Sequence, residues 1–461
     1  MINLYNTLTK TKEHLIPRQD KKIQMFVCGP TVYDYIHIGN ARTFVFFDVV
    51  AKYLRSQGYE VDYIQNITDI DDKIIQRAKE AGHEPLEYAK EYFENFKEDM
   101  TGLGLDSPKY IHATDHIEQV VKQVKTLIDK GHAYLIENDG YYFDLSTFKN
   151  YGKLSGRTAL MADDAVTRID ENSKKKNKGD FCLWKFSKEN EPSWETELGK
   201  GRPGWHIEDT AITEHYFGPQ YDIHGGGQDL IFPHHEAEIT QQESASGKKP
   251  FVKYWMHVAF LVNKDQKMSK SLGNFETINS LLKKYSEEVL RFYLLSSHYR
   301  SPLDYSDGMF TQSQAAVYRI SEFMNKLSRA EGKDNHEADI SFSETKEKFY
   351  GALGDDFNTP EAFGSLFEMI RTLNPLAIEN KISKKQAEEI LSFFKEVNSI
   401  TGTIPSEEQK IPAEVQELMN QREKFRQDKN YEESDKIRAQ IQNLGWEVED
   451  TIYGPLAVKE I

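Results

Sequence analysis

Residues 23–30, IQMFVCGP, decide the fold of this chain, because they describe one strand that ends in a loop. Apolar side chains alternate along residues 23–27, and Gly29-Pro30 then breaks the run. Apolar residues next recur at helical spacing over residues 41–54, and a second strand follows at residues 61–64. Strand, helix and strand in this order predict a βαβ unit, whose ligands bind at the carboxyl ends of the parallel strands.

A short polar segment, His37-Ile38-Gly39-Asn40, lies at that end of the unit and opens the predicted helix near Asn40. A helix start directs unpaired backbone N–H groups and the positive end of the helix dipole at the preceding loop. His37 and Asn40 add side-chain donors, and Gly39 lets a ligand approach the backbone. The segment therefore indicates a phosphate site. The alternative is an ordinary helix cap with a surface histidine.

A second segment, Lys267-Met268-Ser269-Lys270-Ser271, lies in a polar loop behind an aromatic-rich strand. Lys267 and Lys270 are placed to stabilise the charge that develops on a departing pyrophosphate. Taken alone, the cluster is more typical of a solvated loop. Both segments in one chain, in this order on an α/β fold, favour phosphate binding over the helix-cap and solvated-loop alternatives.

A third constellation suggests a metal. The segment Pro233-His234-His235-Glu236-Ala237-Glu238 opens a predicted helix, with its proline at the first position. His234 and Glu238 are four residues apart, so they share one helix face and offer nitrogen and oxygen to one zinc ion. Cys28, after the first strand, is the natural thiolate partner, whereas Cys182 is expected to be buried elsewhere. The alternative is a surface His–Glu pair.

The composition limits the class of protein. The chain has 461 residues, 38% of them hydrophobic and 29% charged, which predicts two to four domains. No apolar run reaches the roughly 20 residues that span a bilayer, and no secretory signal pattern opens the chain. Two cysteines build no disulfide framework, so we expect a cytoplasmic protein. Because the net charge is −16, a polyanionic partner would have to bind at a local basic face of the protein.

The pattern along the chain divides it into parts. We expect an insertion with a helix at residues 117–130 and a hairpin at 134–144, then a return to the α/β pattern with a strand at 221–224. Asn358-Thr359-Pro360-Glu361 starts a helix, and the chain ends in a short helix and a hairpin. The expected parts are a split Rossmann-like catalytic domain (1–110 and 201–247), a connective insertion (111–200), a region with the second segment (248–310), a helical bundle (311–402) and a small α+β domain (403–461).

Longer segments resemble cysteinyl-tRNA synthetases, which are class I aminoacyl-tRNA synthetases, and the resemblance runs from Leu4 to the C-terminus. The first signature of that class corresponds here to His37-Ile38-Gly39-Asn40, with Asn40 where a second histidine often stands. The second signature corresponds to Lys267-Met268-Ser269-Lys270-Ser271. The segments are MFVCGPTVYD (25–34), NITDIDDK (66–73), GRPGWHIE (201–208), DIHGGG (222–227), FPHHE (232–236) and YWMH (254–257).

The resemblance implies one zinc ion per chain that binds the thiolate of the substrate. This chain departs from the family at Asp209, where most members have a second cysteine. The substitution keeps the formal ligand charge, and carboxylate is an accepted zinc ligand, although a harder one. The implied ligands are Cys28, Asp209, His234 and Glu238, and the implied amino-acid pocket is Gly29, Thr68, Trp205 and His224.

The resemblance further implies ATP, with Mg²⁺, held by His37, Gly39, Asn40 and Lys270, and catalysis by His37, Asn40, Lys267 and Lys270. The partners would be L-cysteine and tRNA(Cys), with no membrane, for a monomer whose last domain binds the anticodon. There, Arg422, Arg426 and Lys429 share a helix face that could meet phosphates, and Trp446 could stack on a base. A solvated helix face and a small-core tryptophan are the alternative.

The expected activity is ATP-dependent formation of cysteinyl-adenylate, followed by transfer of the cysteinyl group to the 3′ end of tRNA(Cys). A related ligase that joins cysteine to an amino-sugar is the nearest rival, and the residues after Gly402 argue against it. A catalytically idle RNA-binding regulator is the rival from another class, and Lys267 and Lys270 argue against that.

Overall fold

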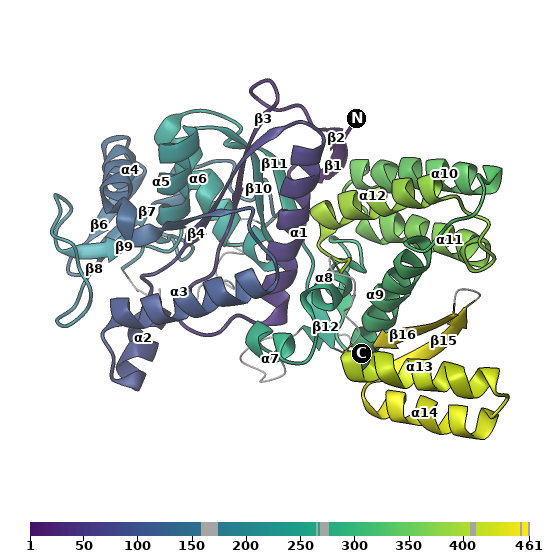
Figure 1. The fold of residues 1–461 in the computed structure, drawn as a ribbon. Helices are drawn as coiled ribbons and strands as arrows, with labels where there is room; N and C mark the ends of the chain where they lie inside the picture. The colour runs from purple at the N-terminus through teal and green to yellow at the C-terminus, as the bar shows by residue number, and fades with distance from the viewer. Residues whose placement is uncertain (158–173, 264–265, 268–275, 406–411, 452–453, 460–461) are drawn as a thin grey trace. The chain divides into compact units, whose positions relative to one another are not determined.

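The computed structural model describes residues 1–157, 174–263, 266–267, 276–405, 412–451 and 454–459 (Figure 1). The chain forms two compact units. The first contains Met1–Lys284 and Tyr299–Asp304, and the second contains Tyr285–His298 and Tyr305–Ile461. None of the helices in these described ranges is long and apolar enough to cross a membrane.

The first unit is built on a five-stranded sheet in the order β11-β10-β3-β4-β5, with every neighbouring pair parallel. From β3 the chain runs outward through β4 and β5, and then returns to the other side of β3 with β10 and β11. The order therefore reverses between β3 and β10, and ligands of such sheets bind at this point. The strands are β3 (Lys22–Val27), β4 (Glu60–Ile67), β5 (Lys109–His112), β10 (Tyr221–Gly227) and β11 (Val252–Val258).

The predicted βαβ unit is confirmed by β3, α1 and β4. Helix α1 (Ile38–Ser56) runs beside the sheet (Figure 1) and begins two residues earlier than Asn40, because His37 is its N-cap. Strand β10 continues through Gly225–Gly227 instead of ending before them. Helix α6 (His234–Ser246) begins one residue later than predicted, since Pro233 is the N-cap and not the first helical residue.

The insertion has its own antiparallel sheet in the order β6-β7-β8-β9, which confirms the predicted hairpin, and α4 (Ile117–Asp129) matches the predicted helix. Cys182 is buried in β8, as expected. Helix α5 (Ile207–Phe217) follows the insertion. The four strands are β6 (Ala133–Ile136), β7 (Gly140–Phe143), β8 (Cys182–Phe186) and β9 (Gly201–Pro203).

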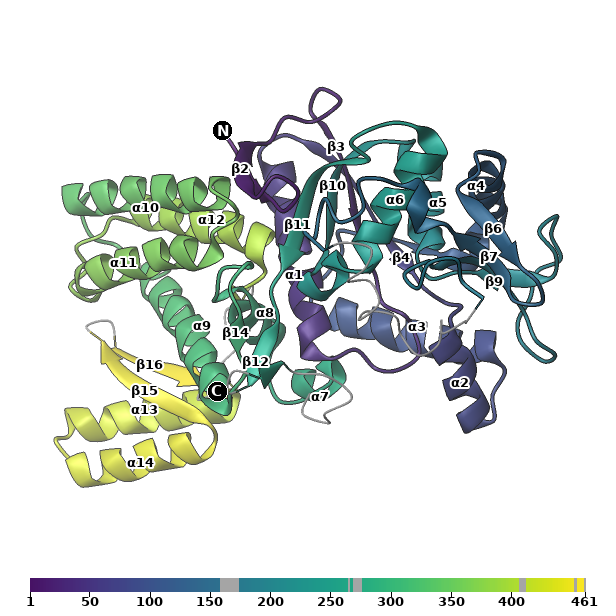
Figure 2. The same ribbon diagram turned by 180° about the vertical axis from the view of Figure 1, so that it is seen from behind.

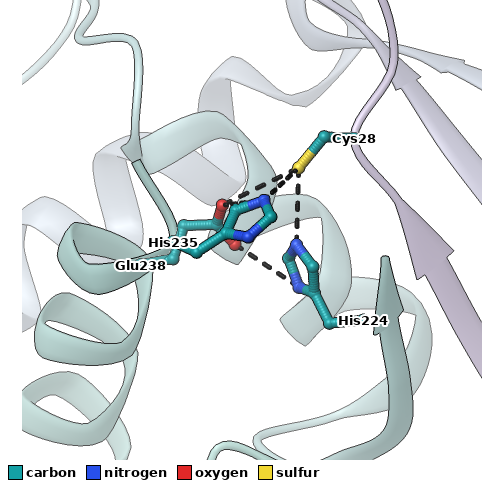
Figure 3. A group of neighbouring side chains, drawn as sticks. All are labelled: Cys28, His224, His235 and Glu238. Carbon is teal, nitrogen blue, oxygen red and sulfur yellow. Dashed lines mark hydrogen bonds and ion pairs between the residues drawn. The ribbon is translucent and has the colours of Figure 1, made fainter. Parts of the chain in front are cut away.

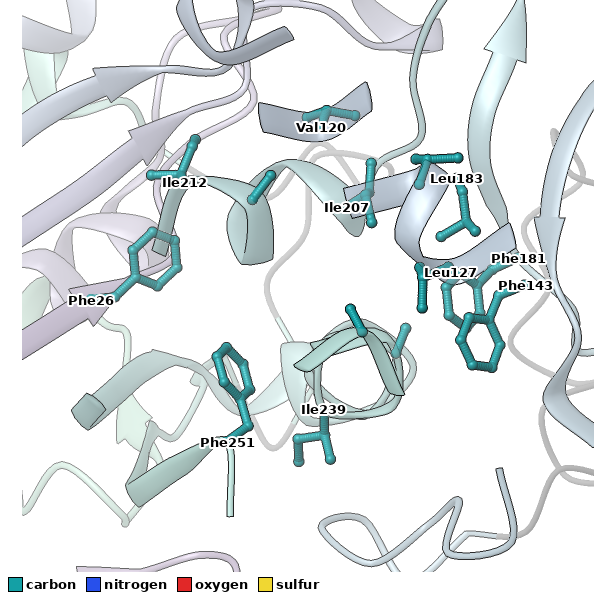
Figure 4. Packing of buried hydrophobic residues seen from close by; sticks show 14 of the residues in the cluster. Phe26, Val120, Leu127, Phe143, Phe181, Leu183, Ile207, Ile212, Ile239 and Phe251 are labelled. Carbon is teal, nitrogen blue, oxygen red and sulfur yellow. The ribbon is translucent and has the colours of Figure 1, made fainter. Parts of the chain in front are cut away.

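One apolar cluster fills both the α/β part and the insertion (Figure 4). It includes Phe26 of β3, Phe143 of β7, Phe181 before β8, Ile212 of α5 and Ile239 of α6, all of them buried. The remaining strands and α-helices of the first unit can be followed in Figure 1 and in Figure 2. They are β1 (Asn3–Asn6), β2 (Thr11–His14), α2 (Asp72–Ala81), α3 (Pro85–Gly102), β12 (Leu261–Asn263), β13 (Gln266–Lys267), α7 (Ile278–Leu282) and β14 (Leu303–Asp304).

The second unit is mostly helical, as predicted. Asn358 caps α11 by accepting the Glu361 N–H, so the predicted helix start is confirmed. The final hairpin is β15 (Trp446–Thr451) paired with β16 (Gly454–Lys459). The helices are α8 (Glu287–Leu295), α9 (Asp307–Leu327), α10 (His336–Gly354), α11 (Thr359–Ile378), α12 (Lys384–Thr401), α13 (Ala413–Gln427) and α14 (Tyr431–Asn443).

The close packing of β10 on α1 gives a first prediction. A Cβ atom at Gly225 would lie 2.2 Å from Cζ of the buried Phe47. Gly225→Ala should therefore lower the free energy of unfolding by about 1–3 kcal/mol, as overpacking does. Urea unfolding of the metal-free chain, followed by circular dichroism, measures this.

Gly364→Ala is the matched control, because the position lies on α11 with nothing within 4 Å of a new Cβ. It should raise stability by up to about 1 kcal/mol through helix propensity. Equal stability of the two variants would contradict the tight packing of β10 on α1.

Candidate active site

A cleft of about 510 Å³ opens at the carboxyl end of the sheet, where the strand order reverses. Its walls come from the ends of β3, β4, β9, β10 and β11 with the segments that follow them, including the first turns of α1 and α5. The structure thus brings together residues from distant parts of the sequence. The predicted site residues that line the cleft are Cys28, Gly29, His37, Gly39, Asn40, Thr68, Trp205, Asp209 and His234.

Four buried side chains beside the cleft form what we call the outer donor group: Cys28, Asp209, His234 and Glu238. Cys28 Sγ lies 3.5 Å from Asp209 Oδ2 and 3.9 Å from Glu238 Oε1. His234 Nε2 lies 2.9 Å from Asp209 Oδ2 and 3.1 Å from Glu238 Oε1. The prediction that His234 and Glu238 share a face of one helix is confirmed.

The donor chemistry of this group fits a cation. Asp209 Oδ1 and Glu238 Oε2 are buried without a hydrogen-bond partner in the described part of the chain. Burial raises the pKa of the Cys28 thiol well above its ordinary value, and the charges of Glu238 and Asp209 raise it further. Burial and the Asp209 charge likewise raise the pKa of Glu238. A bound metal ion reverses both effects and uses the spare oxygens, so this group can hold a metal.

His234 is oriented by two rings. Its Nδ1 lies 2.7 Å from Nδ1 of His206, and the indole of Trp205 stacks on it with a centroid separation of 4.4 Å. Trp205 is 39% exposed and lines the cleft. This arrangement directs Nε2 of His234 at the carboxylates of the group and places an aromatic wall beside it.

Gly29 is held by β4. Its N–H donates to Asn66 Oδ1 at 2.7 Å, and a Cβ atom at this position would lie 1.7 Å from Asn66 O. Asn66 Nδ2 donates to Glu208 Oε1 at 3.2 Å, and Thr68 Oγ1 donates to the same oxygen. This network joins the segment after Cys28 to the residue before Asp209, so it fixes the spacing of two donors.

The first signature combines the two predicted roles. His37 Nδ1 accepts the Asn40 N–H at 3.3 Å, so the histidine caps α1 while it lines the cleft. The ring fills the space next to Gly39, where a Cβ atom would lie 2.9 Å from it. The Ile38 N–H also has a partner, Glu276 O, at 3.2 Å. Side chains and the helix dipole, more than these N–H groups, are therefore available to a ligand.

The second signature lies mostly outside the described residues, which include Lys267 as backbone in β13 but exclude 268–275 and hence Lys270. The residues that follow it pair with the first signature. Thr277 forms an antiparallel bridge with His37, and the Ile278 N–H donates to Ile36 O at 3.3 Å. Segments about 240 residues apart in sequence thus meet at the edge of the cleft.

His224, predicted in the amino-acid pocket, lies below it instead. The side chain is fully buried and absent from the cleft wall, with Nε2 at 3.4 Å from Cys28 Sγ. His235 lies on the same side of the thiol (Figure 3), with Nε2 at 3.1 Å from the sulfur. The sequence patterns predicted no role for His235, Asn66, Glu208 or His206. Each of them lies within two residues of a predicted site residue, and that closeness in sequence was the signal that could have indicated them.

The predicted tRNA residues do not form one exposed face. Arg422 is 2% exposed, and Trp446 packs in the small core of the C-terminal segment, which corresponds to the small-core alternative. Arg426 is half-buried and Lys429 is exposed, so these two side chains reach the surface.

Comparisons with known proteins agree with this geometry. The family "tRNA synthetases class I (C) catalytic domain" matches residues 14–316, and the family "DALR domain" matches residues 348–404. The fold resembles Mycobacterium tuberculosis methionyl-tRNA synthetase (TM-score 0.60, 16% identity, 82% of this chain and 89% of that chain). It also resembles the Agrobacterium radiobacter K84 LeuRS in its complex with tRNA (TM-score 0.61, 10% identity, 84% and 85%).

The chain is therefore a class I aminoacyl-tRNA synthetase. Among its relatives, the cysteine–tRNA ligase of Carboxydothermus hydrogenoformans is 44% identical and covers 98% of this chain and 99% of its own. That of Clostridioides difficile is 41% identical over 98% and 99%. The chain belongs to the cysteine–tRNA ligase family.

The network around Gly29 yields a second prediction. Asn66→Ala leaves the Gly29 N–H without its partner and removes one of the two side-chain donors to Glu208 Oε1. It should lower the free energy of unfolding by about 1–3 kcal/mol, as buried unpaired groups do. Urea unfolding of the metal-free chain is the measurement.

Asn95→Ala is the control, since it removes one solvent-exposed hydrogen bond, to Glu91 O. Its effect should stay within about 0.5 kcal/mol. If both variants change stability equally, Asn66 does not hold the end of β3 in place.

Proposed function

We propose that this cysteine–tRNA ligase selects its amino acid with a zinc ion held by the outer donor group, and that the adenylate forms in the cleft beside it. The observation that carries the proposal is the cleft itself. The same cleft is lined by Cys28, Asp209 and His234 and by His37 and Asn40.

Zinc would bind the thiolate of cysteine far more tightly than the hydroxyl of serine, which gives selectivity without an editing step. The protein's part is to hold the donors and to leave one side open. Asp209 supplies a carboxylate where the family usually has a thiolate, and its free Oδ1 supports a role as a ligand. Trp205, Gly29 and Thr68 line the same part of the cleft and would enclose the substrate.

His37, Gly39 and Asn40 would hold ATP, with Mg²⁺ as its counter-ion. The positive end of α1 and the two side chains favour the triphosphate. Lys267 and Lys270 keep their proposed role on the departing pyrophosphate, supported by the pairing of residues 276–278 with the first signature. Chemistry of this kind relies on position and electrostatics, with no covalent enzyme intermediate.

The cysteinyl group would then pass to the 3′ end of tRNA(Cys). Relatives named as cysteine–tRNA ligases match nearly the whole chain, which disfavours the amino-sugar ligase. In the C-terminal segment we propose that Arg426 and Lys429 contact tRNA phosphates. The burial of Arg422 and Trp446 supports a structural role for these two side chains. The domain boundaries, the monomeric state and the cytoplasmic location remain predictions.

Cysteine-dependent exchange between ATP and labelled pyrophosphate tests the proposal, together with the zinc content of the purified chain. Cys28→Ser replaces a ligand common to every donor arrangement described above. It should reduce bound zinc to near zero and lower cysteine-dependent exchange by at least about 100-fold. The wild type should favour cysteine over serine by a factor of at least about 100.

Cys182→Ser is the matched control, because Cys182 is the other buried cysteine and lies in β8 of the insertion. It should keep its zinc and its exchange activity. Equal exchange with serine and cysteine in the wild type, or full zinc in Cys28→Ser, would contradict the proposal.

A further inference from the structure

Cys28 and Glu238 belong to a second set of four donors, completed by His224 and His235 (Figure 3). We call this set the inner donor group. His224, His235 and Glu238 are fully buried, and none of the three lines the cleft. The outer and inner groups thus lie on two sides of the same thiol, one facing the cleft and one facing the interior.

The spacing of the inner group suits one small ion. Zinc bonds of about 2.0–2.3 Å in a tetrahedron separate the ligands by about 3.3–3.8 Å. Cys28 Sγ lies 3.1 Å from His235 Nε2, 3.4 Å from His224 Nε2 and 3.9 Å from Glu238 Oε1. His235 Nε2 lies 4.0 Å from that same oxygen. The four ligand atoms all lie within 4.8 Å of one another, and small side-chain movements would bring them to tetrahedral spacing. In this structure His224 also meets Glu238 through Nδ1 and Oε2, at 3.6 Å.

Both inner histidines are held by partners behind them. His224 Nδ1 is hydrogen-bonded to the Tyr221 hydroxyl at 2.6 Å, and His235 Nδ1 to His257 Nε2 at 2.8 Å. His257 is held in turn by Thr7 Oγ1 at 2.8 Å. A hydrogen bond at one ring nitrogen, with the other directed at a shared centre, is the arrangement of histidines that bind metals.

The two groups differ in chemical softness because of Asp209. The outer group offers one thiolate, one imidazole and two carboxylates, whereas the inner group offers one thiolate, two imidazoles and one carboxylate. Zinc sites are made chiefly of cysteine and histidine, so replacing a carboxylate with an imidazole favours the inner group. A cysteine thiolate at residue 209 would instead favour zinc binding by the outer group.

We propose that the inner donor group is a second position for the zinc ion, which competes with the outer position for Cys28 and Glu238. An ion held there is beyond the reach of a substrate in the cleft, so the inner position is closed and the outer one is open. The inference deepens the metal site of the proposed function and rests on it.

Zinc K-edge absorption of the full chain counts imidazole and sulfur ligands directly. Without substrate, the wild type should show more than one imidazole per zinc ion. L-cysteine should draw the ion outward, lowering the imidazole count to one and raising the sulfur count from one to two. A single imidazole both with and without cysteine would overturn the proposal.

Asp209→Asn removes an outer ligand only, with almost no change of shape. It should keep about one zinc ion per chain with two imidazoles, while cysteine-dependent exchange falls at least about 100-fold. If this variant instead loses zinc as completely as Cys28→Ser, no inner position exists. The double variant Asp209→Asn/His235→Gln lacks a ligand of each group and should lose the ion; retention there would also overturn the proposal.

His235→Gln alone removes an inner ligand only. It should keep its zinc with one imidazole, independent of cysteine. The outcomes are separable from those of the proposed function, because the absence of cysteine-dependent exchange in the wild type would refute that function while the ligand counts would still locate the ion.

Discussion

The structure depends on one electrostatic constraint, the gathering of acids around Cys28 in the interior of the first unit. A thiol and the carboxyls of Asp209 and Glu238 lie within hydrogen-bond range, and Glu208 adds a further carboxyl nearby. Burial and mutual repulsion raise the pKa of both Cys28 and Glu238. Such a cluster opposes folding unless a cation or protons neutralise it. The surrounding elements are arranged to hold this cluster in place.

Helix α6 shows how the fold supports it. Residues 234–245 are all buried, although most of them are polar. The helix is anchored through its side chains: Glu236 accepts the N–H groups of Leu154 and Ser155. These two hydrogen bonds satisfy one oxygen of a carboxylate that would be costly to bury alone, and they help to orient the helix that carries His234 and Glu238. The ligand-bearing helix is thus positioned by hydrogen bonds as much as by apolar packing.

Sequence patterns predicted the layout well, because periodicity and helix caps act locally. The βαβ unit around Cys28, the hairpin of the insertion and the cap at Asn358 are found where expected. The spacing of His234 and Glu238 on one helix also followed from geometry alone. The family resemblance supplied Asp209, which no local pattern could connect to Cys28.

The sequence patterns could not predict how deeply individual side chains are buried. Alternation along β10 tells which face of a strand His224 occupies, but not that the residue lies beneath the thiol. Adjacent residues on a helix point about 100° apart, so with His234 assigned to the metal group His235 was not expected to contact Cys28 Sγ. Arg422 looked like a surface cation because composition does not reveal burial. Such facts depend on how distant segments pack together.

The apolar cluster that extends from the sheet into the insertion has a consequence for the modularity of the enzyme. Phe26 belongs to the central strand, whereas Phe143 and Phe181 belong to the insertion, and all three are members of one core. Removing the insertion, residues 113–203, would uncover apolar side chains of α5 and α6 and expose them to water. The insertion is therefore an integral part of the folding unit, and it can be neither excised nor exchanged as an independent appendage.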